Sequence, residues 1–402
     1  MIDFESDATR VELEELKTFV ELHGRDCRVV RWAFAYRTLR NKIWWQWRRW
    51  LLSQFSKGPA KDNRLHVFWH LRGGIGDCAT HRVCVEAWRK KLPNAVFYYY
   101  TQSPGAAHIL FEENDKNIIL GGGGNPLWYK YDVAFEVCLS FRTVHVNQKR
   151  VQQVAPEICP ILTEGLRRQQ RLGFFVQDNY MCDEVLGRFM HHKRVPQLTV
   201  QQYLSGLDFD VNETGLLPLA LRDPKVLNKY GLSGKRYITI HSGVNTAMPL
   251  QGHHPLKCWP EEKWSEFVRL FKAQYPDILV VQLGGELSPK FSFVDKCLTQ
   301  QTDLTEIAAI LDQALLHVDG ESGLVQLTRW LQTKAVVLFA HTSPDMFSLS
   351  KNCNLFAQAC EPCMWLTGGK WYIKCVCRHA TCRNLDAITP QQVLAAVQTQ
   401  LH

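Results

Sequence analysis

The sequence predicts an α/β fold made of two halves, each built around a parallel sheet. In the first half an apolar strand over residues 65–71 leads through Arg72-Gly-Gly-Ile-Gly-Asp77 into a helix, and a second strand follows at 96–100. This order of strand, glycine loop, helix and strand is typical of a βαβ unit. After residue 236 apolar strands and helical patterns alternate again, and glycines and prolines interrupt the pattern over 205–224. We therefore expect two Rossmann-like domains.

The spacing of apolar residues defines each element. A short amphipathic helix is predicted over 9–23, with Val11, Leu13, Leu16, Phe19 and Val20 as its apolar residues. The remaining expected elements are a Trp-rich helix within 28–57, a strand at 132–139, a helix-rich region at 143–192, strands at 236–241, 278–283, 315–318 and 335–340, and helices at 260–274, 304–312 and 322–332. These elements and the breaks between them divide the chain into three parts. They are an N-terminal helical, basic and Trp-rich extension (1–62), a first Rossmann-like domain (63–215) and a second one (216–402) that contains a cysteine-rich segment at 360–382.

The net charge of +8 is concentrated in one segment. Residues 28–57 contain eight basic residues and no acidic one, together with five of the thirteen tryptophans. A helix with basic and aromatic residues can bind an anionic membrane surface, or it can pack on its own domain. We expect membrane-surface binding and keep the second alternative open. We do not expect nucleic-acid binding, because the basic residues form one helix rather than a groove.

The N-terminal residues and the cysteines predict the cellular compartment of the protein. The first residues are acidic and lack the apolar core of a signal peptide, and no apolar run is as long as a transmembrane helix. Fourteen cysteines are spread over 402 residues rather than concentrated in a small domain. We therefore expect a cytoplasmic protein with reduced thiols.

The glycine loop after the first strand suggests two kinds of site. Gly74-Ile-Gly76-Asp-Cys-Ala79 fits the dinucleotide fingerprint, but the second strand ends in Tyr100-Thr-Gln-Ser103 without the acid that binds a ribose. An aspartate at this edge of the sheet can instead take a proton from a hydroxyl group, which makes Asp77 a candidate general base. The alternative is that Asp77 caps the following helix.

A second loop carries a candidate phosphate site. Ile238-Thr-Ile-His241-Ser-Gly243 is a strand that runs into a small polar loop, and Lys257-Cys-Trp-Pro260 precedes a helix that starts with two glutamates. Pro260 suits the first helical position, and a lysine beside a helix N-terminus can bind phosphate. This layout resembles the donor-binding loop of the ADP-heptose:lipopolysaccharide heptosyltransferases, glycosyltransferase family 9.

The resemblance extends along the second half of the chain, over roughly 236–390, and also includes 65–90. Glu321-Ser-Gly-Leu-Val-Gln326 lies where the family has Asp-Ser/Thr-Gly and, three residues after the glycine, a His; here Glu and Gln replace the two family residues. The resemblance implies the GT-B fold, in which two Rossmann-like domains, one for the acceptor and one for the nucleotide sugar, face a cleft. It implies nucleotide or substrate binding by Gly74, Gly76, Ser242, Gly243, Thr246, Glu286, Glu321, Ser322, Gly323 and Gln326.

The cysteine-rich segment has the spacing of a metal site. Cys360-Glu-Pro-Cys363 is followed by Cys375, Cys377 and Cys382, and two pairs of thiolates suit zinc or iron. The family resemblance agrees, because many members keep such a cluster and the related autotransporter heptosyltransferases bind iron through one. We expect Cys360, Cys363, Cys375 and Cys382 as ligands, with Cys377 as a competitor for Cys375. The alternative is a set of free thiols.

Together these features predict an inverting glycosyltransferase that needs no cofactor for catalysis. Asp77 would deprotonate the acceptor hydroxyl, and Lys257 with nearby helix N-termini would stabilise the departing diphosphate. The resemblance implies heptose transfer from ADP-heptose to a lipopolysaccharide core or other surface glycan, on the inner face of the inner membrane if the protein is peripheral. Two alternatives stay open: a protein acceptor, as in autotransporter heptosylation, and a non-catalytic nucleotide-sugar-binding protein.

Overall fold

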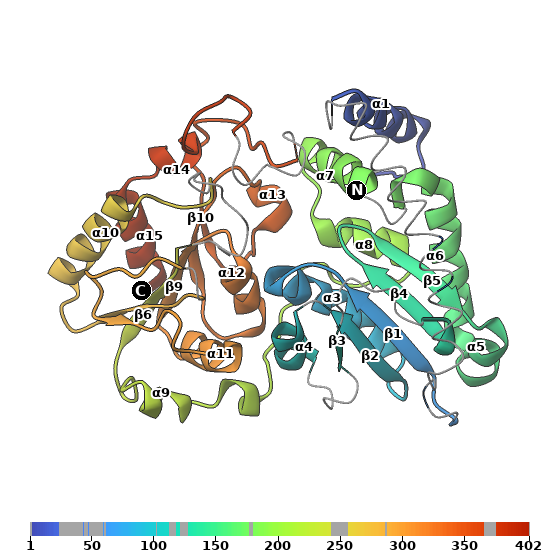
Figure 1. Ribbon diagram of the computed structural model, residues 1–402, viewed down its shortest axis with the longest axis horizontal. Helices are drawn as coiled ribbons and strands as arrows, with labels where there is room; N and C mark the ends of the chain where they lie inside the picture. The colour runs from blue at the N-terminus through green and yellow to red at the C-terminus, as the bar shows by residue number, and fades with distance from the viewer. Residues whose placement is uncertain are drawn as a thin grey trace. The chain divides into compact units, whose positions relative to one another are not determined.

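The computed structural model describes residues 2–23, 43, 47, 59, 62–101, 103–111, 118–120, 128–176, 180–242, 256–285, 288–365 and 375–401. It divides into two compact units. One consists of Met1–Gly74 and Thr80–Val211, and the other of Ile75–Ala79 and Asn212–His402. Each unit contains one sheet flanked by helices, which confirms the predicted α/β class (Figure 1).

The first unit has a five-stranded sheet. Its strands are β1 (His66–Leu71), β2 (Val96–Thr101), β3 (Ile118–Leu120), β4 (Val133–Val137) and β5 (Phe141–Val146), in the order β3-β2-β1-β4-β5. All pairs are parallel except β4 with β5. The antiparallel β5 corrects the expectation of helix from residue 143, because a tight turn, in which Cys138 N donates to Ser140 O, folds the chain back onto β4.

Helices complete the first unit, in chain order α3, α4, α5, α6, α7 and α8. Their bounds are α3 (Ile75–Lys91, whose first five residues cluster with the second unit), α4 (Pro104–Phe111), α5 (Gln148–Val154), α6 (Cys159–Leu172), α7 (Tyr180–Lys193) and α8 (Gln197–Ser205), with short 3-10 turns at Trp128–Lys130, Pro156–Ile158 and Gly173–Val176. Trp69 on β1 is fully buried and its ring lies 4.8 Å from that of Phe135 on β4. Such aromatic burial on a central strand fixes which face of the strand is inward.

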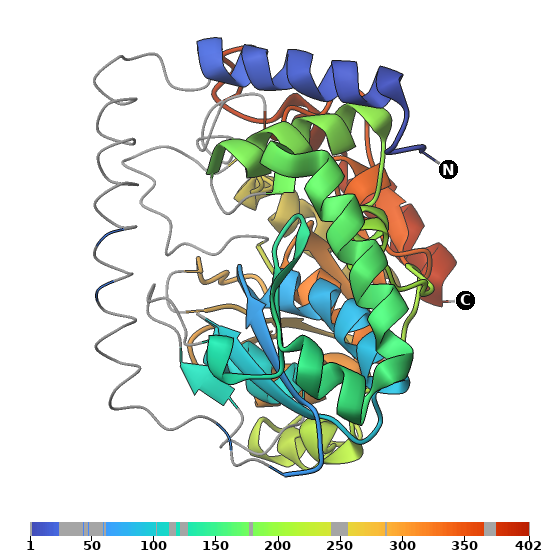
Figure 2. The ribbon, with the colours of Figure 1, turned by 90° about the vertical axis from the view of Figure 1, so that its right-hand side faces the viewer.

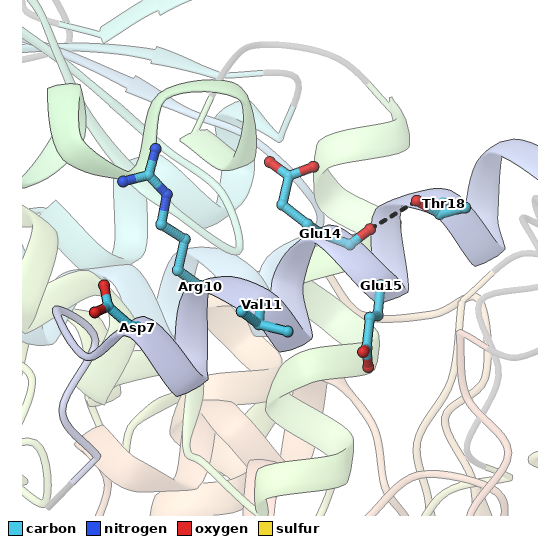
Figure 3. A pocket seen from close by; sticks show the side chains of 6 residues that line it. All are labelled: Asp7, Arg10, Val11, Glu14, Glu15 and Thr18. Carbon is cyan, nitrogen blue, oxygen red and sulfur yellow. Dashed lines mark hydrogen bonds between the residues drawn. The ribbon is translucent and has the colours of Figure 1, made fainter.

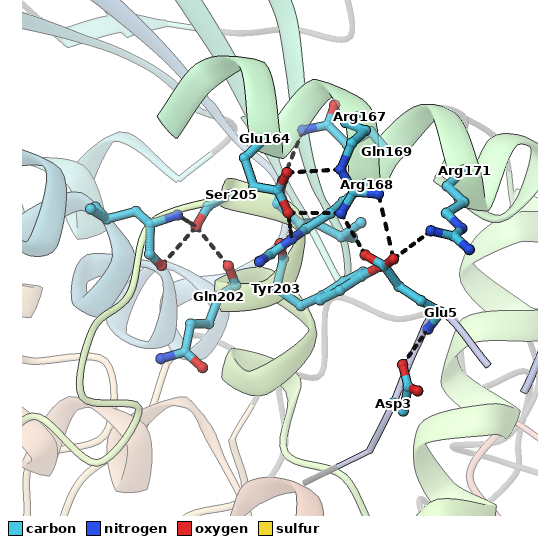
Figure 4. Close-up of polar contacts among 12 residues, drawn as sticks. Asp3, Glu5, Glu164, Arg167, Arg168, Gln169, Arg171, Gln202, Tyr203 and Ser205 are labelled. Carbon is cyan, nitrogen blue, oxygen red and sulfur yellow. Dashed lines mark hydrogen bonds and ion pairs between the residues drawn. The ribbon is translucent and has the colours of Figure 1, made fainter. Parts of the chain in front are cut away.

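The N-terminal segment is anchored on the first unit. Helix α1 (Asp7–His23) confirms the helix predicted for 9–23 and packs against α7 (Figure 2). Ahead of it, Glu5 accepts hydrogen bonds from Arg167 (2.7 Å), Arg171 (2.5 Å) and Tyr203 (3.2 Å), as Figure 4 shows. An exposed hollow runs along α1, lined by Asp7, Arg10, Val11, Glu14, Glu15 and Thr18 (Figure 3). No predicted site residue lines it.

The second unit has a six-stranded, fully parallel sheet. Its strands are β6 (Tyr237–Ile240), β7 (Leu279–Gln282), β8 (Lys296–Cys297), β9 (Leu316–Gly320), β10 (Ala335–Leu338) and β11 (Cys353–Leu355), in the order β11-β10-β9-β6-β7-β8. The chain starts in the centre, winds outward through β7 and β8, returns to β9 and winds outward on the other side. This is the strand order of a doubly wound dinucleotide-binding sheet.

Helices α10 (Glu261–Gln274) and α15 (Pro390–Leu401) pack together over one face of this sheet. Trp264, Phe267 and Phe271 recur on one side of α10 and are completely buried in the same core cluster as strand residues Ile238 and Val280. The remaining helices are α9 (Val226–Lys229), α11 (Leu304–Asp312), α12 (Gly323–Leu327), α13 (Pro344–Phe347) and α14 (Arg383–Ala387), with 3-10 turns at Leu219–Arg222 and Thr328–Trp330.

Two helix bounds differ from the sequence prediction. The helix predicted over 322–332 stops at Leu327 and continues as a 3-10 turn, and Pro260 is the N-cap of α10 rather than its first residue. No helix in the described part of the chain combines the length and apolar character needed to cross a membrane.

Candidate functional site

The strand order of the second unit predicts where a ligand would bind. The winding direction reverses between β6 and β9, which are neighbours in the sheet. In open α/β sheets, ligands bind beyond the carboxyl ends of the strands at this reversal. The residues that follow β6 and β9 are His241-Ser242 and Glu321-Ser322-Gly323. Four of these five residues are predicted site residues, and the fifth, His241, lies beside one of them.

An ion pair joins the loop before α10 to the end of β9. Lys257 Nζ donates to Glu321 Oε2 at 2.5 Å and to the Glu321 carbonyl oxygen at 3.3 Å. The Glu321 side chain is 9% exposed and the Lys257 side chain 20% exposed. Lys257 and Glu321 therefore form an ion pair, and the lysine charge is held at the carboxyl end of the sheet.

The turn after β9 is closed by Ser322. Its hydroxyl oxygen accepts hydrogen bonds from Leu324 N (3.1 Å) and Val325 N (3.5 Å), so Ser322 is the N-cap of α12. Serine is favoured at this position because its oxygen satisfies backbone N–H groups that have no partner within the helix.

Two glycines, Gly76 and Gly323, allow the start of α3 to contact the turn after β9. Within the second unit, a Cβ added to Gly76 would lie 3.1 Å from Gly323 Cα, and one added to Gly323 would lie 2.3 Å from Ile75 Cγ2. Neither position has room for a side chain, so the first turn of α3 lies directly on the first turn of α12. Trp330 Nε1 donates to Ala79 O at 2.8 Å and ties the same segment down.

Asp77 follows this glycine contact. It is exposed and lies in the first turn of α3, two residues after the helix begins at Ile75. The N-cap alternative for Asp77 is therefore wrong, because a cap precedes the first helical residue. Gly74 is also exposed, and Gly73 before it has a φ of +99°, a conformation that favours glycine.

A buried carboxylate that the sequence prediction missed lies at the same place. Asp319 on β9 is completely buried, and its Oδ2 lies 2.9 Å from His241 Nδ1, 3.2 Å from His317 Nε2 and 2.5 Å from Ser322 Oγ. Burial would raise the pKa of Asp319, but the charge and hydrogen bonds of His241 and His317 outweigh it and hold that pKa below its usual value. Asp319 lies within an apolar strand pattern, and a single acid in such a pattern does not predict a site residue.

A neutral histidine lies near Lys257. His341 follows β10 and is buried; burial, followed by the charge of Lys257, lowers its pKa to about 3. His341 is therefore uncharged at neutral pH. Ser242 is also buried, and its hydroxyl has no hydrogen-bond partner among the described residues.

Gln326, which replaces the family histidine, is already engaged. Its Nε2 donates to the Phe347 carbonyl oxygen at 2.7 Å, and the residue is 5% exposed. Three other predicted binding residues, Gly243, Thr246 and Glu286, lie outside the described residues.

The cysteine-rich segment is tied to the end of β10. Cys363 N donates to His341 O (3.0 Å), and Asn384 Nδ2 donates to Ala340 O (3.0 Å) and Cys360 O (2.9 Å). Burial raises the pKa of the Cys360, Cys363 and Cys382 thiols, and the neighbouring Cys375 adds to the rise in each. The neighbouring Cys377 also raises the pKa of the Cys360 thiol.

These thiols are neighbours, but they do not surround one point. Among the described residues, no three His, Cys, Asp or Glu side chains are arranged to hold a metal ion. The described cysteines of this segment form no disulfide with one another. The donor set has the right chemistry for zinc or iron, and the metal site stays a prediction.

Comparison with known proteins agrees with this geometry. Residues 243–365 match the model of glycosyltransferase family 9 (heptosyltransferase). The structure is similar to that of ADP-heptose lipopolysaccharide heptosyltransferase II of E. coli, with 16% identity, coverage of 84% of this chain and 98% of that one, and a TM-score of 0.54. It is also similar to the iron-containing dodecameric glycosyltransferase TibC of enterotoxigenic E. coli, with 14% identity, coverage of 84% and 76%, and a TM-score of 0.53. No curated protein matches the sequence.

The structural similarities establish the fold, a mixed α/β architecture with parallel sheets that matches GT-B heptosyltransferases. Together with the family match they define the class: the protein is a glycosyltransferase. Its resemblance to glycosyltransferase family 9 is confirmed over residues 243–365.

Proposed function

We propose that this protein is an inverting transferase that moves heptose from ADP-heptose to a hydroxyl group of its acceptor. The observation that carries the proposal is the contact of Gly76 with Gly323. It joins the turn that contains Asp77 to the turn that contains Glu321, which in turn holds Lys257. A candidate base and a candidate phosphate-binding cation thus occur in one part of one unit. The enzyme class favours this reaction over the non-catalytic alternative.

The two residues have complementary tasks. Asp77, exposed in the first turn of α3, would take the proton from the acceptor hydroxyl as its oxygen attacks the anomeric carbon. The bond to the nucleoside diphosphate would break as the new bond forms, with inversion at that carbon. Lys257, held by Glu321, would stabilise the negative charge that develops on the diphosphate. No metal takes part in these steps.

The acceptor we propose first is a lipopolysaccharide core or other surface glycan. A glycolipid acceptor explains the basic, Trp-rich segment 28–57, which would bind the anionic inner face of the cytoplasmic membrane. Ile43 and Trp47, four residues apart in helical conformation, are 60% and 53% exposed, which supports an apolar face turned to a lipid surface.

The second acceptor is a protein. The resemblance of the cysteine-rich segment to that of iron-binding autotransporter heptosyltransferases favours it. Sedimentation with vesicles of phosphatidylglycerol separates the two. A glycolipid acceptor predicts binding that Trp47→Ala weakens, whereas a soluble protein acceptor predicts that the protein stays in the supernatant.

The reaction itself is tested with a panel of labelled nucleotide sugars, including ADP-heptose and UDP-hexoses. We expect release of nucleoside diphosphate from ADP-heptose, with transfer of label once a core glycolipid is added. Release from no member of the panel, with or without acceptors, would contradict the proposed reaction.

A further inference from the structure

One carboxylate connects three segments at the reversal point of the second sheet. Asp319 Oδ2 accepts hydrogen bonds from His241 at the end of β6, from His317 on β9 and from Ser322 at the start of α12. Asp319 and His317 are completely buried, and His241 is 7% exposed. A single charged oxygen atom thus bonds to side chains from both strands that meet at the expected ligand position.

The protons of this network can be assigned from its chemistry. An ionised carboxylate only accepts hydrogen bonds, so His241 Nδ1, His317 Nε2 and Ser322 Oγ each carry a proton toward it. His317 has its other ring nitrogen 2.9 Å from Thr239 Oγ1, deeper in the sheet. In His241 the bond to Asp319 uses Nδ1, and Nε2 is the other ring nitrogen. The carboxylate therefore fixes both the orientation and the tautomer of His241.

The position of this pair distinguishes it from an ordinary core contact. A buried carboxylate bonded to polar side chains adds little to stability compared with apolar packing, because its charge loses its hydration. Here the pair spans β6 and β9, the two strands between which the winding direction reverses. Ser322, bonded to the same carboxylate, is adjacent to Glu321, which binds Lys257. Asp319 also has a second oxygen, Oδ1, that is buried without a partner among the described residues.

We propose that His241 is a donor-binding residue, whose Nε2 contacts the diphosphate of the nucleotide sugar, and that Asp319 is its positioning residue. The inference rests on the proposed function and adds two residues to it. Asp319 acts through His241 and contacts no substrate atom itself. Groups that orient a metal-binding histidine in this way change affinity or activity about 10–100-fold when they are removed, and we expect an effect of the same size here.

The test compares His241→Gln, Asp319→Asn and the double variant. Affinity is measured by titration calorimetry with ADP, and KM and kcat are measured with ADP-heptose. We expect each single variant to weaken ADP binding and raise the donor KM by about 10–100-fold, with a smaller effect on kcat. The double variant should be no weaker than His241→Gln, because Asp319 acts through that ring.

Thr239→Val serves as the matched control, since Thr239 contacts His317 and not His241. It should leave ADP affinity unchanged. If Asp319→Asn fails to fold, as judged by its thermal unfolding, the ADP affinities of His241→Gln and Ser322→Ala are compared with that of the wild type instead.

Two results would overturn the inference: unchanged ADP affinity in His241→Gln, or effects of the two single variants that multiply in the double variant. If the wild-type protein binds ADP but transfers no sugar, the proposed reaction is contradicted. The role of His241 is then decided by comparing the ADP affinities of the wild type and His241→Gln.

Discussion

At the scale of single residues, the exchange of the family aspartate for Glu321 still allows this side chain to hold Lys257. The longer side chain still brings Oε2 to 2.5 Å from Lys257 Nζ. The other exchange has a different consequence, because Gln326 Nε2 bonds to the carbonyl oxygen of Phe347. Gln326 therefore links α12 to α13, and its binding role stays a prediction.

Lys257→Ala should weaken donor use. Removing one preorganised donor to a developing negative charge typically lowers kcat about 10²–10³-fold, and we expect a loss of this size with ADP-heptose, together with weaker ADP binding. The control is Lys263→Ala, which removes a lysine in α10 that bonds to backbone oxygens at Asp386 and Ile388. Unchanged kinetics and ADP affinity in Lys257→Ala would exclude the phosphate role.

Sequence patterns identified the residues that stand in loops better than those in strands. Lys257 was predictable because a lysine beside a helix N-terminus can bind phosphate, and Glu321 was predictable because the residues around it resemble the family motif. Asp319 was not, because a single acid in an apolar strand gives no periodic signal. Its importance arises from His241, 78 positions away, which only the folded chain brings near.

At the scale of elements, the close approach of α3 and α12 depends on having no side chain at two positions. Gly323→Ala would place a methyl group 2.3 Å from Ile75 Cγ2. We expect a loss of about 1–3 kcal/mol in unfolding free energy and reduced transfer, because the turn with Asp77 must shift. Gly285→Ala, where an added Cβ meets nothing within 4 Å, is the control. Equal stability and activity in the two variants would contradict this packing.

The cysteine-rich segment supplies a second prediction for an element. Protein purified under reducing conditions should carry about one zinc or iron ion per chain, measured by mass spectrometry of the metal. Cys363→Ser should lose the metal and unfold at lower temperature, whereas Cys297→Ser, outside the segment, should keep it. Wild-type protein without metal after growth with both ions supplied would favour the free-thiol alternative.

Elements with regular spacing were predicted well, and irregular ones were not. Helix α11 has the expected bounds of 304–312 because its capping box and apolar spacing agree. Strand β5 was missed because its register depends on the turn at Cys138–Ser140 and on pairing with β4. Helix α12 ends early because Thr328–Trp330 tightens into a 3-10 turn, which apolar spacing does not reveal.

At the scale of the whole molecule, the two-part organisation followed from the alternation of strands and helices, whereas the expected cleft between the domains stays a prediction. The sequence could not show the strand order, since this depends on which strands pair. In the second unit that order places β6 beside β9, and so gathers a site from residues about 80 positions apart.

The first unit should lose stability in acid through Glu136. Burial would raise the pKa of this carboxyl group, but the hydrogen bond from His70 and the charges of Arg142, His70 and Arg72 lower it to about 2. A lowered pKa stabilises the folded state above the usual value of 4.5, and this contribution is lost as the pH falls from about 4.5 to about 2.

Glu136→Gln should therefore lower the unfolding free energy of the first unit at pH 7 by on the order of 2–3 kcal/mol. The stability of this unit should then also depend less on pH in the acid range. Amide hydrogen exchange in β1 and β4 measures this unit by itself. Glu266→Gln, which breaks the exposed pair with Arg269, should change little, because exposed ion pairs contribute little. Identical exchange in the two variants across this pH range would contradict the assignment.

The central claim, that Asp77 is the base of a transfer whose leaving group Lys257 stabilises, is tested most directly by Asp77→Asn. Transfer from ADP-heptose and affinity for ADP are measured on the same preparation, with Asp208→Asn, an aspartate that bonds to Gln202, as control. Transfer should fall by about 10²–10⁴-fold while ADP affinity stays close to that of the wild type. Transfer at the wild-type rate by Asp77→Asn would contradict the account.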